Sequence, residues 1–264
     1  MLLMLLAASV QLRGQKEAYK GYFKVGAVVN QFRPAYNDVN FKFFDPVSGV
    51  NMNSPLHFDN TSNNYGIKVE LIELVTRQGF VINPFDFTMA FNAKAAWVTC
   101  GTGGGYEVTV LKRYASHLKR EKVPFVKFRV GALLNYGFYE NYLFSNIRSV
   151  NSNPIHVGLQ VLTDKINIDL TKDVWMINPH ASLSFRLTNK MDIRFMALYN
   201  LVFFSNEHLY FYESKVFYSK YSNFKSTSGS EDEYLFNASN KPVSRNIYSL
   251  APFSFRVELS FLLK

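Results

Sequence analysis

The stretch from Pro252 to Leu263 alternates between apolar and polar side chains over its whole length. The apolar set is Phe253, Phe255, Val257, Leu259 and Phe261, and the polar set is Ser254, Arg256, Glu258 and Ser260. Because β-strand side chains point to opposite faces with a period of two, this segment predicts a strand with one wholly apolar face. Soluble strands average roughly five to six residues, whereas a strand that crosses a bilayer needs roughly nine to eleven. The length therefore favours a transmembrane strand.

The same alternation recurs in segments 85–97, 126–138, 175–187 and 193–203. In the first of them, the apolar face runs from Phe85 to Trp97, and Asp86 and Lys94 lie on the opposite face. Repeated alternation of this length predicts an all-β fold, a transmembrane antiparallel up-and-down β-barrel whose apolar faces contact lipid. A soluble β-sandwich is the alternative, but its strands are usually shorter.

The number of strands follows from the turns between these segments. We expect about ten strands, near 20–30, 65–75, 85–98, 106–115, 124–139, 155–162, 166–172, 174–187, 191–204 and 248–263. The apolar phase shifts between Val161 and Ile166, so eight or twelve strands also fit. The short turn Thr188–Lys190 is expected on the periplasmic side. Segments 31–64 and 205–246 are then long extracellular loops and the natural binding surface.

The composition and the N-terminal segment agree with an exported β-barrel. The chain has 25 Phe and 16 Tyr but a single cysteine, so it cannot form an internal disulfide framework. No apolar run reaches the roughly eighteen residues of a transmembrane helix. Residues 1–14 have the length and apolar core of a signal peptide, cleaved after Ser9 or, as we prefer, after Gly14. Residues 15–264 then form one barrel domain in the outer membrane of a Gram-negative cell.

The polar faces predict a charged barrel interior. The side chains expected to line the lumen are Lys94, Lys127, Arg129, Arg186, Asp192, Arg194, Arg256 and Glu258, with Lys24, Lys68, Glu70, Asp86, Glu107 and Asp169 beside them. Charges confined away from water must pair, because an unpaired buried ion is costly. A closed, salt-bridged lumen would leave a structural or binding role for the loops. A narrow porin-like channel with a slight anion preference is the other interpretation.

Signals of catalysis or of nucleic-acid binding are weak. The net charge of +9 is spread over many strands, and the one basic cluster, Lys112 to Lys122, suits lipid phosphates at a membrane surface. We therefore expect no nucleic-acid partner, no metal and no cofactor, and a protein that is not an enzyme. The alternative is a lipid-modifying hydrolase with His180 as base and Ser182 as nucleophile, although the alternation turns both residues inward.

Three stretches carry a family resemblance: the export signal ending near Gly14-Gln15, the segment Tyr22–Ala27, and the alternating segment 252–263. Together they resemble the outer-membrane β-barrel proteins of Bacteroidota. The terminal strand is similar to the signal read by the barrel-assembly machinery. The resemblance implies that machinery, outer-membrane lipid and lipopolysaccharide as partners.

Overall fold

The computed structural model describes residues 19–34, 38–57, 62–93, 95–115, 118–157, 160–213, 234–237, 239–241 and 248–263. The expected signal peptide, 1–14, and Lys94 lie outside these ranges. Within them, no helix is long and apolar enough to cross a membrane.

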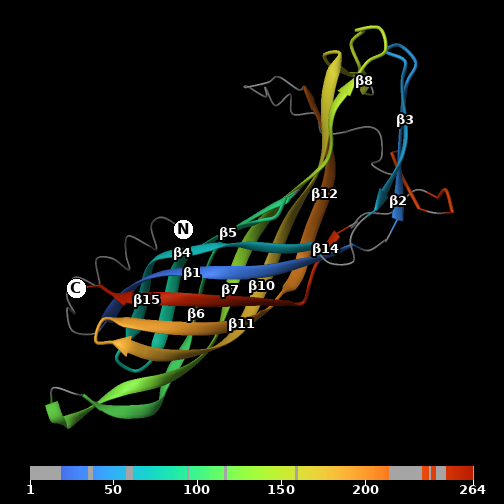
Figure 1. Cartoon of the computed structure of the whole chain (residues 1–264). Coiled ribbons are helices and arrows are strands. Elements are labelled where there is room, and N and C mark those ends of the chain that lie inside the picture. The colour runs from blue at the N-terminus through green and yellow to red at the C-terminus, as the bar shows by residue number, and fades with distance from the viewer. Residues whose placement is uncertain are drawn as a thin grey trace, which may run out of the picture.

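Eight long strands close into an antiparallel ring (Figure 1). They are β1 (Tyr19–Pro34), β4 (Ser62–Thr76), β5 (Phe80–Phe91), β6 (Ala95–Ala115), β7 (Leu118–Arg148), β10 (Lys165–Thr188), β11 (Met191–Tyr199) and β15 (Phe253–Leu262). Each strand pairs with the next in this order, and β15 closes the ring by pairing with β1, from Tyr22–Leu262 to Val29–Phe255. The predicted all-β up-and-down barrel is confirmed, with eight strands at the lower end of the expected range.

The expected count of ten strands is too high because segment 155–162 is not a ring strand and segments 166–172 and 174–187 are one strand. Segment 85–98 is also not one strand, although this error leaves the count unchanged: the chain reverses between Phe91 and Ala95, where the amide of Asn92 donates to the carbonyl of Ala95. The alternation restarts after this turn, so Trp97 is buried inside the barrel instead of facing lipid. Segments 166–172 and 174–187 are both part of the single strand β10. Apolar residues alternate on both sides of the Asn92 turn, so the sequence pattern reads as one continuous strand across the reversal.

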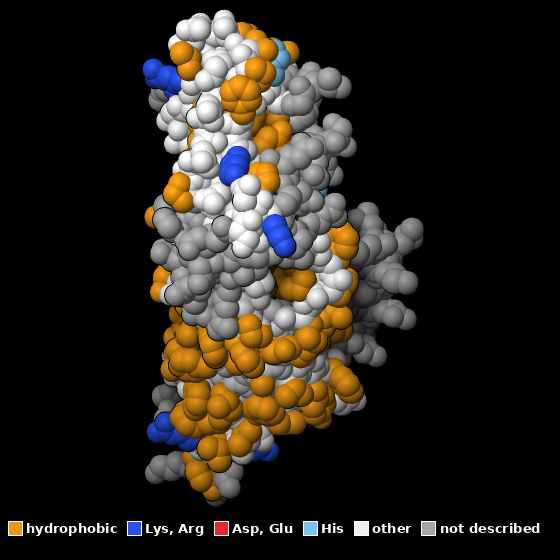
Figure 2. Space-filling model, turned by 90° about the vertical axis from the view of Figure 1, so that its right-hand side faces the viewer, with side chains coloured by type: hydrophobic (Ala, Val, Ile, Leu, Met, Phe, Trp, Pro, Cys, Tyr) orange, Lys and Arg blue, Asp and Glu red, His pale blue; other side chains and the backbone are white. Residues whose placement is uncertain are grey.

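The outer face of the ring is an apolar belt. Figure 2 shows hydrophobic side chains forming a continuous band across the lower part of the molecule, with lysines and arginines below and above it. Phe195 and Phe255, for example, are 48% and 59% exposed. Aromatic pairs, Tyr136 with Trp175 and Tyr199 with Phe253, lie at one border of the belt, with ring centroids 5.3 and 5.2 Å apart. An exposed apolar band edged by aromatic rings matches a lipid-facing barrel surface.

The two ends of the ring differ in their connections. Short turns at 77–79 and 189–190 join β4 to β5 and β10 to β11 at one end. The connections from β1 to β4 and from β7 to β10, and the one that leads into β15, leave from the opposite end and are much longer. Short turns lie on the periplasmic side of such barrels, so the long connections are extracellular.

A second layer of β-structure stands on the extracellular end. β7 and β10 run past the barrel and continue together with β12 (Leu201–Glu213) as a three-stranded extension. A separate sheet of β2 (Asp38–Asp45), β3 (Val50–His57) and β13 (Leu235–Phe236) packs on it (Figure 1). Phe43 contacts Phe211 at 5.8 Å between ring centroids, and Phe41 contacts Phe144 at 5.0 Å. We call this two-layer unit the extracellular sandwich.

The extracellular sandwich corrects the expectation that 31–64 and 205–246 are loops. Val39, Phe41 and Phe43 alternate with polar residues and are buried, which the abundance of Asn, Pro and Ser in this segment obscured. Two further short pairs of strands complete the described chain: β8 (His156–Val157) with β9 (Gln160–Val161), and β14 (Tyr248–Leu250) with β1.

Asp45 fixes the tip of the extracellular sandwich. Its carboxylate accepts hydrogen bonds from Ser48 Oγ (2.6 Å), the Val47 amide (3.0 Å) and the His156 amide (2.7 Å). Burial alone would raise the pKa of Asp45, but these hydrogen bonds outweigh it and lower the pKa to about 2. The β2–β3 turn and β8 are therefore held by one charged residue.

Candidate functional site

The middle of the lumen is filled by ion pairs around Glu73 of β4. Arg129 of β7 donates two hydrogen bonds to the Glu73 carboxylate, and the one from Nη2 to Oε1 is 2.8 Å long. Lys24 contacts the same carboxylate, and Arg194 Nη1 lies 3.3 Å from it. All four side chains are buried, so Glu73 joins β1, β7 and β11 to β4 across the interior.

Lys68 is the centre of a second group of ion pairs. Its Nζ lies 3.0 Å from Glu70, 2.8 Å from Asp86 and 2.7 Å from Glu258. Arg256 holds the other side of Asp86, with Nη1 at 2.9 and 3.1 Å from its two oxygens. The carboxylates of three different strands thus surround one buried ammonium group.

A third group lies toward the periplasmic end. Lys127 bridges Glu107 and Asp192 at 3.2 Å each, and Arg186 lies 3.3 Å from Asp192. Glu107 also accepts a hydrogen bond from Arg129 at 2.6 Å, which links this group to Glu73. The three groups therefore form one continuous network, which we call the lumen network.

The positive and negative charges of the lumen network nearly balance. Among the described residues it joins seven cations to six carboxylates: Lys24, Lys68, Lys127, Arg129, Arg186, Arg194 and Arg256 with Glu70, Glu73, Asp86, Glu107, Asp192 and Glu258. Because eight strands enclose an interior that side chains can fill, these groups occupy the space a channel would need. Each ion depends on its partners, since a buried charge without one is strongly destabilising.

A chain of hydrogen-bonded amides lies in the lumen above the ions. Asn135 donates to Asn178 (2.6 Å), Asn178 donates to Asn200 (2.7 Å), and Asn200 donates to Ser254 Oγ (2.8 Å). The cavity beside this chain, which Trp97, Thr99 and Met176 also line, has a volume of about 10 Å³. That volume holds about one water molecule at most. Ion pairs and this chain of amides thus occupy the described lumen at two levels.

The periplasmic mouth is open by contrast. A pocket of about 830 Å³ lies below the lumen network and is lined by Lys20, Arg77, Lys127 and Arg186, among other residues. Glu107 is the acidic residue of its lining. This mouth is basic and ends against the Lys127 ion pairs.

The structure brings together most of the lumen residues expected from the sequence. Lys127, Arg129, Arg186, Asp192, Arg194, Arg256 and Glu258 all take part in the lumen network, and Lys94 lies outside the described residues. Glu73 was not expected there. Tyr22 and Lys24 of β1 pair with Glu73 and Glu70 of β4, so β4 carries one extra residue between them. This bulge turns both Leu71 and Ile72 outward and Glu73 inward.

Asp169 was expected in the lumen, and this prediction is wrong. It lies on the extracellular extension, on the same face of β10 as Trp175, whereas Asn178 and His180 face the lumen. Burial raises the pKa of Asp169 to about 7, against an opposing hydrogen bond from Tyr212 and with a smaller further increase from Glu140. Strand 166–172 is continuous with 174–187, and the alternation of the whole strand sets this direction.

His180 and Ser182 both lie inside the barrel. They are 6% and 3% exposed, and the Ser182 hydroxyl has no hydrogen-bond partner. A serine nucleophile is activated through a hydrogen bond to its base, and this structure does not contain that bond. Among the described residues, no group of three or more His, Cys, Asp or Glu could hold a metal ion.

No protein-family model and no curated protein matches the sequence. Among solved structures, Neisserial surface protein A is 9% identical with a TM-score of 0.41, over 94% of this chain and 100% of that one. A Pseudomonas aeruginosa FadL homologue is 8% identical with a TM-score of 0.29, over 74% and 46% of the two chains. The outer-membrane protease OmpT from Escherichia coli is 7% identical with a TM-score of 0.28, over 94% and 97%.

The class assignment rests on the structure of this chain. A closed ring of eight antiparallel strands, an apolar belt, short turns at one end and three long connections beside the short β5–β6 reversal at the other together define an outer-membrane β-barrel. The protein is an outer-membrane β-barrel protein.

Proposed function

We propose that this protein is a non-conducting, non-enzymatic barrel that anchors the extracellular sandwich in the outer membrane as a binding structure. The lumen network is the observation that carries the proposal. Side chains from all eight ring strands meet there in direct ion pairs, and the Asn135–Asn178–Asn200 layer lies above them. An ion entering from the basic periplasmic mouth would have to replace these partners to proceed.

The extracellular sandwich supports the binding role. Its buried core is continuous with the top of the barrel, because Trp97 and Met176 belong to the same cluster as Phe41 and Phe211. A rigid scaffold that positions surface segments is the usual arrangement of a binding site. The Bacteroidota affiliation and the lipopolysaccharide and assembly-machinery partners stay proposals drawn from the sequence resemblance.

Single-channel recording of the refolded full chain in a planar lipid bilayer tests the closed lumen. We expect no stepwise conductance from the wild type. Arg129→Ala and Glu73→Ala combined with Asn178→Ala remove the central pair and interrupt the amide layer, and this triple variant should give measurable openings, which shows that the assay detects an opened lumen. Regular openings of the folded wild-type protein would overturn the proposal and favour a small channel.

A further inference from the structure

The small sheet of the extracellular sandwich has a second face, which points away from the core. Its inner face carries the buried side chains of Val39, Phe41 and Phe43, so the residues between them point outward. The outward side chains that the structure describes are Asn40, Lys42 and Phe44 on β2, Asn51, Asn53 and Pro55 on β3, and Phe236 on β13. We call this surface the outer sheet face.

Strand pairing arranges these side chains in three rows across the sheet. Phe44 lies opposite Asn51, Lys42 lies opposite Asn53, and Asn40 lies between Phe236 and Pro55. Each row therefore places one amide beside an aromatic ring or a long alkyl stem. From the first row to the third, the face spans about 13 Å at roughly 3.3 Å per residue, which is long enough for a ligand of several repeating units.

The amides of the outer sheet face are available to a ligand. Within the described part of the chain, the side chains of Asn40, Asn51 and Asn53 make no hydrogen bond. The Lys42 ammonium is engaged by contrast, because it lies 4.9 Å from the centre of the Phe236 ring and also contacts Asn240. A side-chain amide has two donor hydrogens and an acceptor oxygen. The face therefore offers neutral donors and acceptors side by side.

Phe44 presents its ring to solvent on this face. It is 66% exposed, whereas Phe41 and Phe43 of the same strand are buried. Asn and Pro are depleted in strands, yet three asparagines and Pro55 share this face with the exposed ring. Departures from local preference that bring no stability are expected at functional surfaces. The outer sheet face is therefore a candidate binding surface.

The composition of the face indicates the chemistry of its ligand. Its described side chains include no carboxylate, and its lysine is engaged, so neither a cation nor a polyanion finds complementary charge here. A protein partner needs a cluster of apolar anchors, and among the described residues of this face Phe44 is the single exposed large apolar side chain. An open ring beside neutral amides matches a sugar, which stacks its C–H face on an aromatic ring and exchanges hydrogen bonds through its hydroxyl groups.

The outer sheet face lies on the free side of the sandwich. In Figure 1 the β2–β3 hairpin stands beyond the ring, and Figure 2 looks onto this side of the molecule, where the part above the apolar belt is mostly polar and uncharged. A ligand of this face therefore comes from the aqueous exterior and not from the bilayer.

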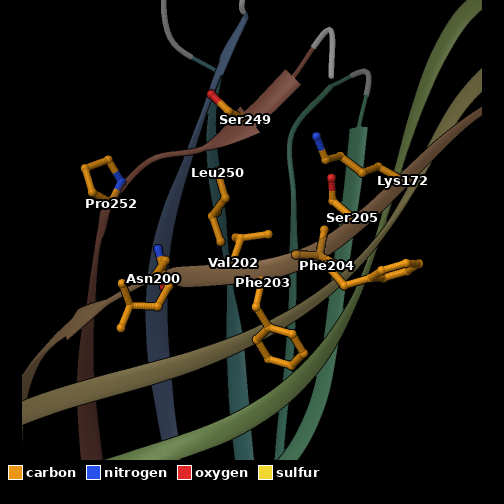
Figure 3. Close-up of a pocket in the computed structure, with 11 residues that line it drawn as sticks. Lys172, Asn200, Val202, Phe203, Phe204, Ser205, Ser249, Leu250 and Pro252 are labelled. Atoms are coloured by element: carbon orange, nitrogen blue, oxygen red, sulfur yellow. The ribbon is translucent and has the colours of Figure 1, made fainter. Parts of the chain in front are cut away.

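A hollow in the barrel wall below the sandwich has a different character. It has a volume of about 690 Å³ and lies between residues 200–205 and 249–252 (Figure 3). Its polar residues Lys172, Ser205 and Ser249 already interact with other groups of the protein. The amides of the outer sheet face have no such partners among the described residues, so this face is the stronger candidate for a ligand.

We propose that the outer sheet face binds a neutral oligosaccharide at the cell exterior. One sugar ring stacks on Phe44, and hydroxyl groups of this unit and the next exchange hydrogen bonds with Asn51 and Asn53. This inference rests on the proposed binding role of the extracellular sandwich and names the ligand class of that role.

An array of neutral and acidic oligosaccharides, probed with the full chain, tests the ligand class. The protein is kept in a polyoxyethylene detergent, which contains no sugar. It carries a fluorophore on Cys100, the single cysteine, which is exposed on β6 of the barrel and therefore leaves the sandwich unmodified. We expect binding to neutral oligosaccharides. Binding to none of them, or to acidic oligosaccharides alone, would overturn the proposal.

Titration of the strongest neutral ligand in solution tests the site. Phe44→Ala should weaken binding about tenfold because the stacked ring is lost, whereas Phe44→Tyr should retain it. Asn51→Ala combined with Asn53→Ala should also weaken binding about tenfold. Val150→Ala is the control: Val150 is 72% exposed at the tip of the same sandwich but lies outside the outer sheet face, so this variant should bind as the wild type does.

The outcomes separate this site from the proposed function. Equal affinity of Phe44→Ala and Val150→Ala would overturn the outer sheet face as the site, although the sandwich would still bind sugar. Regular openings in the bilayer recording would overturn the closed barrel and leave the affinities for the oligosaccharide unchanged. The two failures can therefore be told apart.

Discussion

Arg129 and Glu73 form a two-point contact across the barrel, from β7 to β4, although these strands are not neighbours in the ring. Two parallel hydrogen bonds between a guanidinium and a carboxylate fix both distance and orientation. This pair therefore sets the separation of opposite walls, in addition to neutralising two buried charges.

The first prediction concerns this pair. Arg129→Ala leaves Glu73 with less compensation in the closed interior and should destabilise the folded barrel by about 3–5 kcal/mol. Arg186→Ala is the control, because the Arg186 side chain is 20% exposed and joins the lumen network through Asp192, so a loss of about 1 kcal/mol or less is expected. Urea-induced unfolding in lipid vesicles measures both values. Equal losses in the two variants would contradict a central role for Glu73.

The second prediction concerns the tip of the extracellular sandwich. Asp45→Ala removes an acceptor from the amides of Val47 and His156 and should loosen the β2–β3 turn by about 1–3 kcal/mol. Hydrogen exchange of residues 45–50 and 156–157 reports this loss, while exchange in the barrel strands should stay unchanged. Since the pKa of Asp45 is lowered to about 2, the stabilisation is present above pH 4 and fades as the pH falls toward 2. Unaltered protection in the variant would show that the turn holds without the carboxylate.

The third prediction concerns pH and the extension of β10. The pKa of Asp169 is raised from 3.8 to about 7, so the folded extension binds a proton more tightly than the unfolded chain does. The contribution of Asp169 to the free energy of unfolding of the extension is greatest below pH 4. It declines as the pH rises toward 7, by on the order of 1 kcal/mol per pH unit. Hydrogen exchange of 166–172, corrected for the intrinsic rate, should therefore show weaker protection at pH 8 than at pH 5. Asp169→Asn should remove most of this difference, and a wild-type protein without any difference would refute the prediction.

The fourth prediction concerns Gly137, which packs against the buried ring of Trp97. A Cβ added at Gly137 would overlap the indole, so Gly137→Ala should cost about 1–3 kcal/mol and shift the Trp97 fluorescence in a Trp175→Phe background. Gly21→Ala serves as control, because its Cβ would meet Leu263 at an ordinary 3.7 Å. An unshifted spectrum with unchanged stability would mean that the indole has room to move.

The sequence predicts the barrel well because its strands keep a strict period of two over long distances. Arg129, Arg194 and Arg256 each stand between apolar neighbours, and the structure has all three buried in the lumen. Glu73 could not be placed in the same way, because the bulge at Leu71–Ile72 is visible only in the pairing with β1. The separation of β12 from β15 was also hidden. Leu201 and Phe203 continue an apolar alternation, and the point of separation at Asn200 depends on partners just over fifty residues away in the chain.

Closure of the ring by β15 has a consequence for how the protein is assembled. Lys68 meets Glu258 across 190 positions of the chain, and Arg256 meets Asp86 across 170. Until β15 pairs with β1, these four charged side chains remain hydrated. They must lose their water when the two strands pair. Contacts between such distant segments form slowly because the intervening chain must first be brought together. We therefore expect the pairing of β15 with β1 to limit the rate of folding into the membrane. Conditions that neutralise Glu258 or Asp86 before this step should change that rate more than a substitution on the lipid-facing surface does.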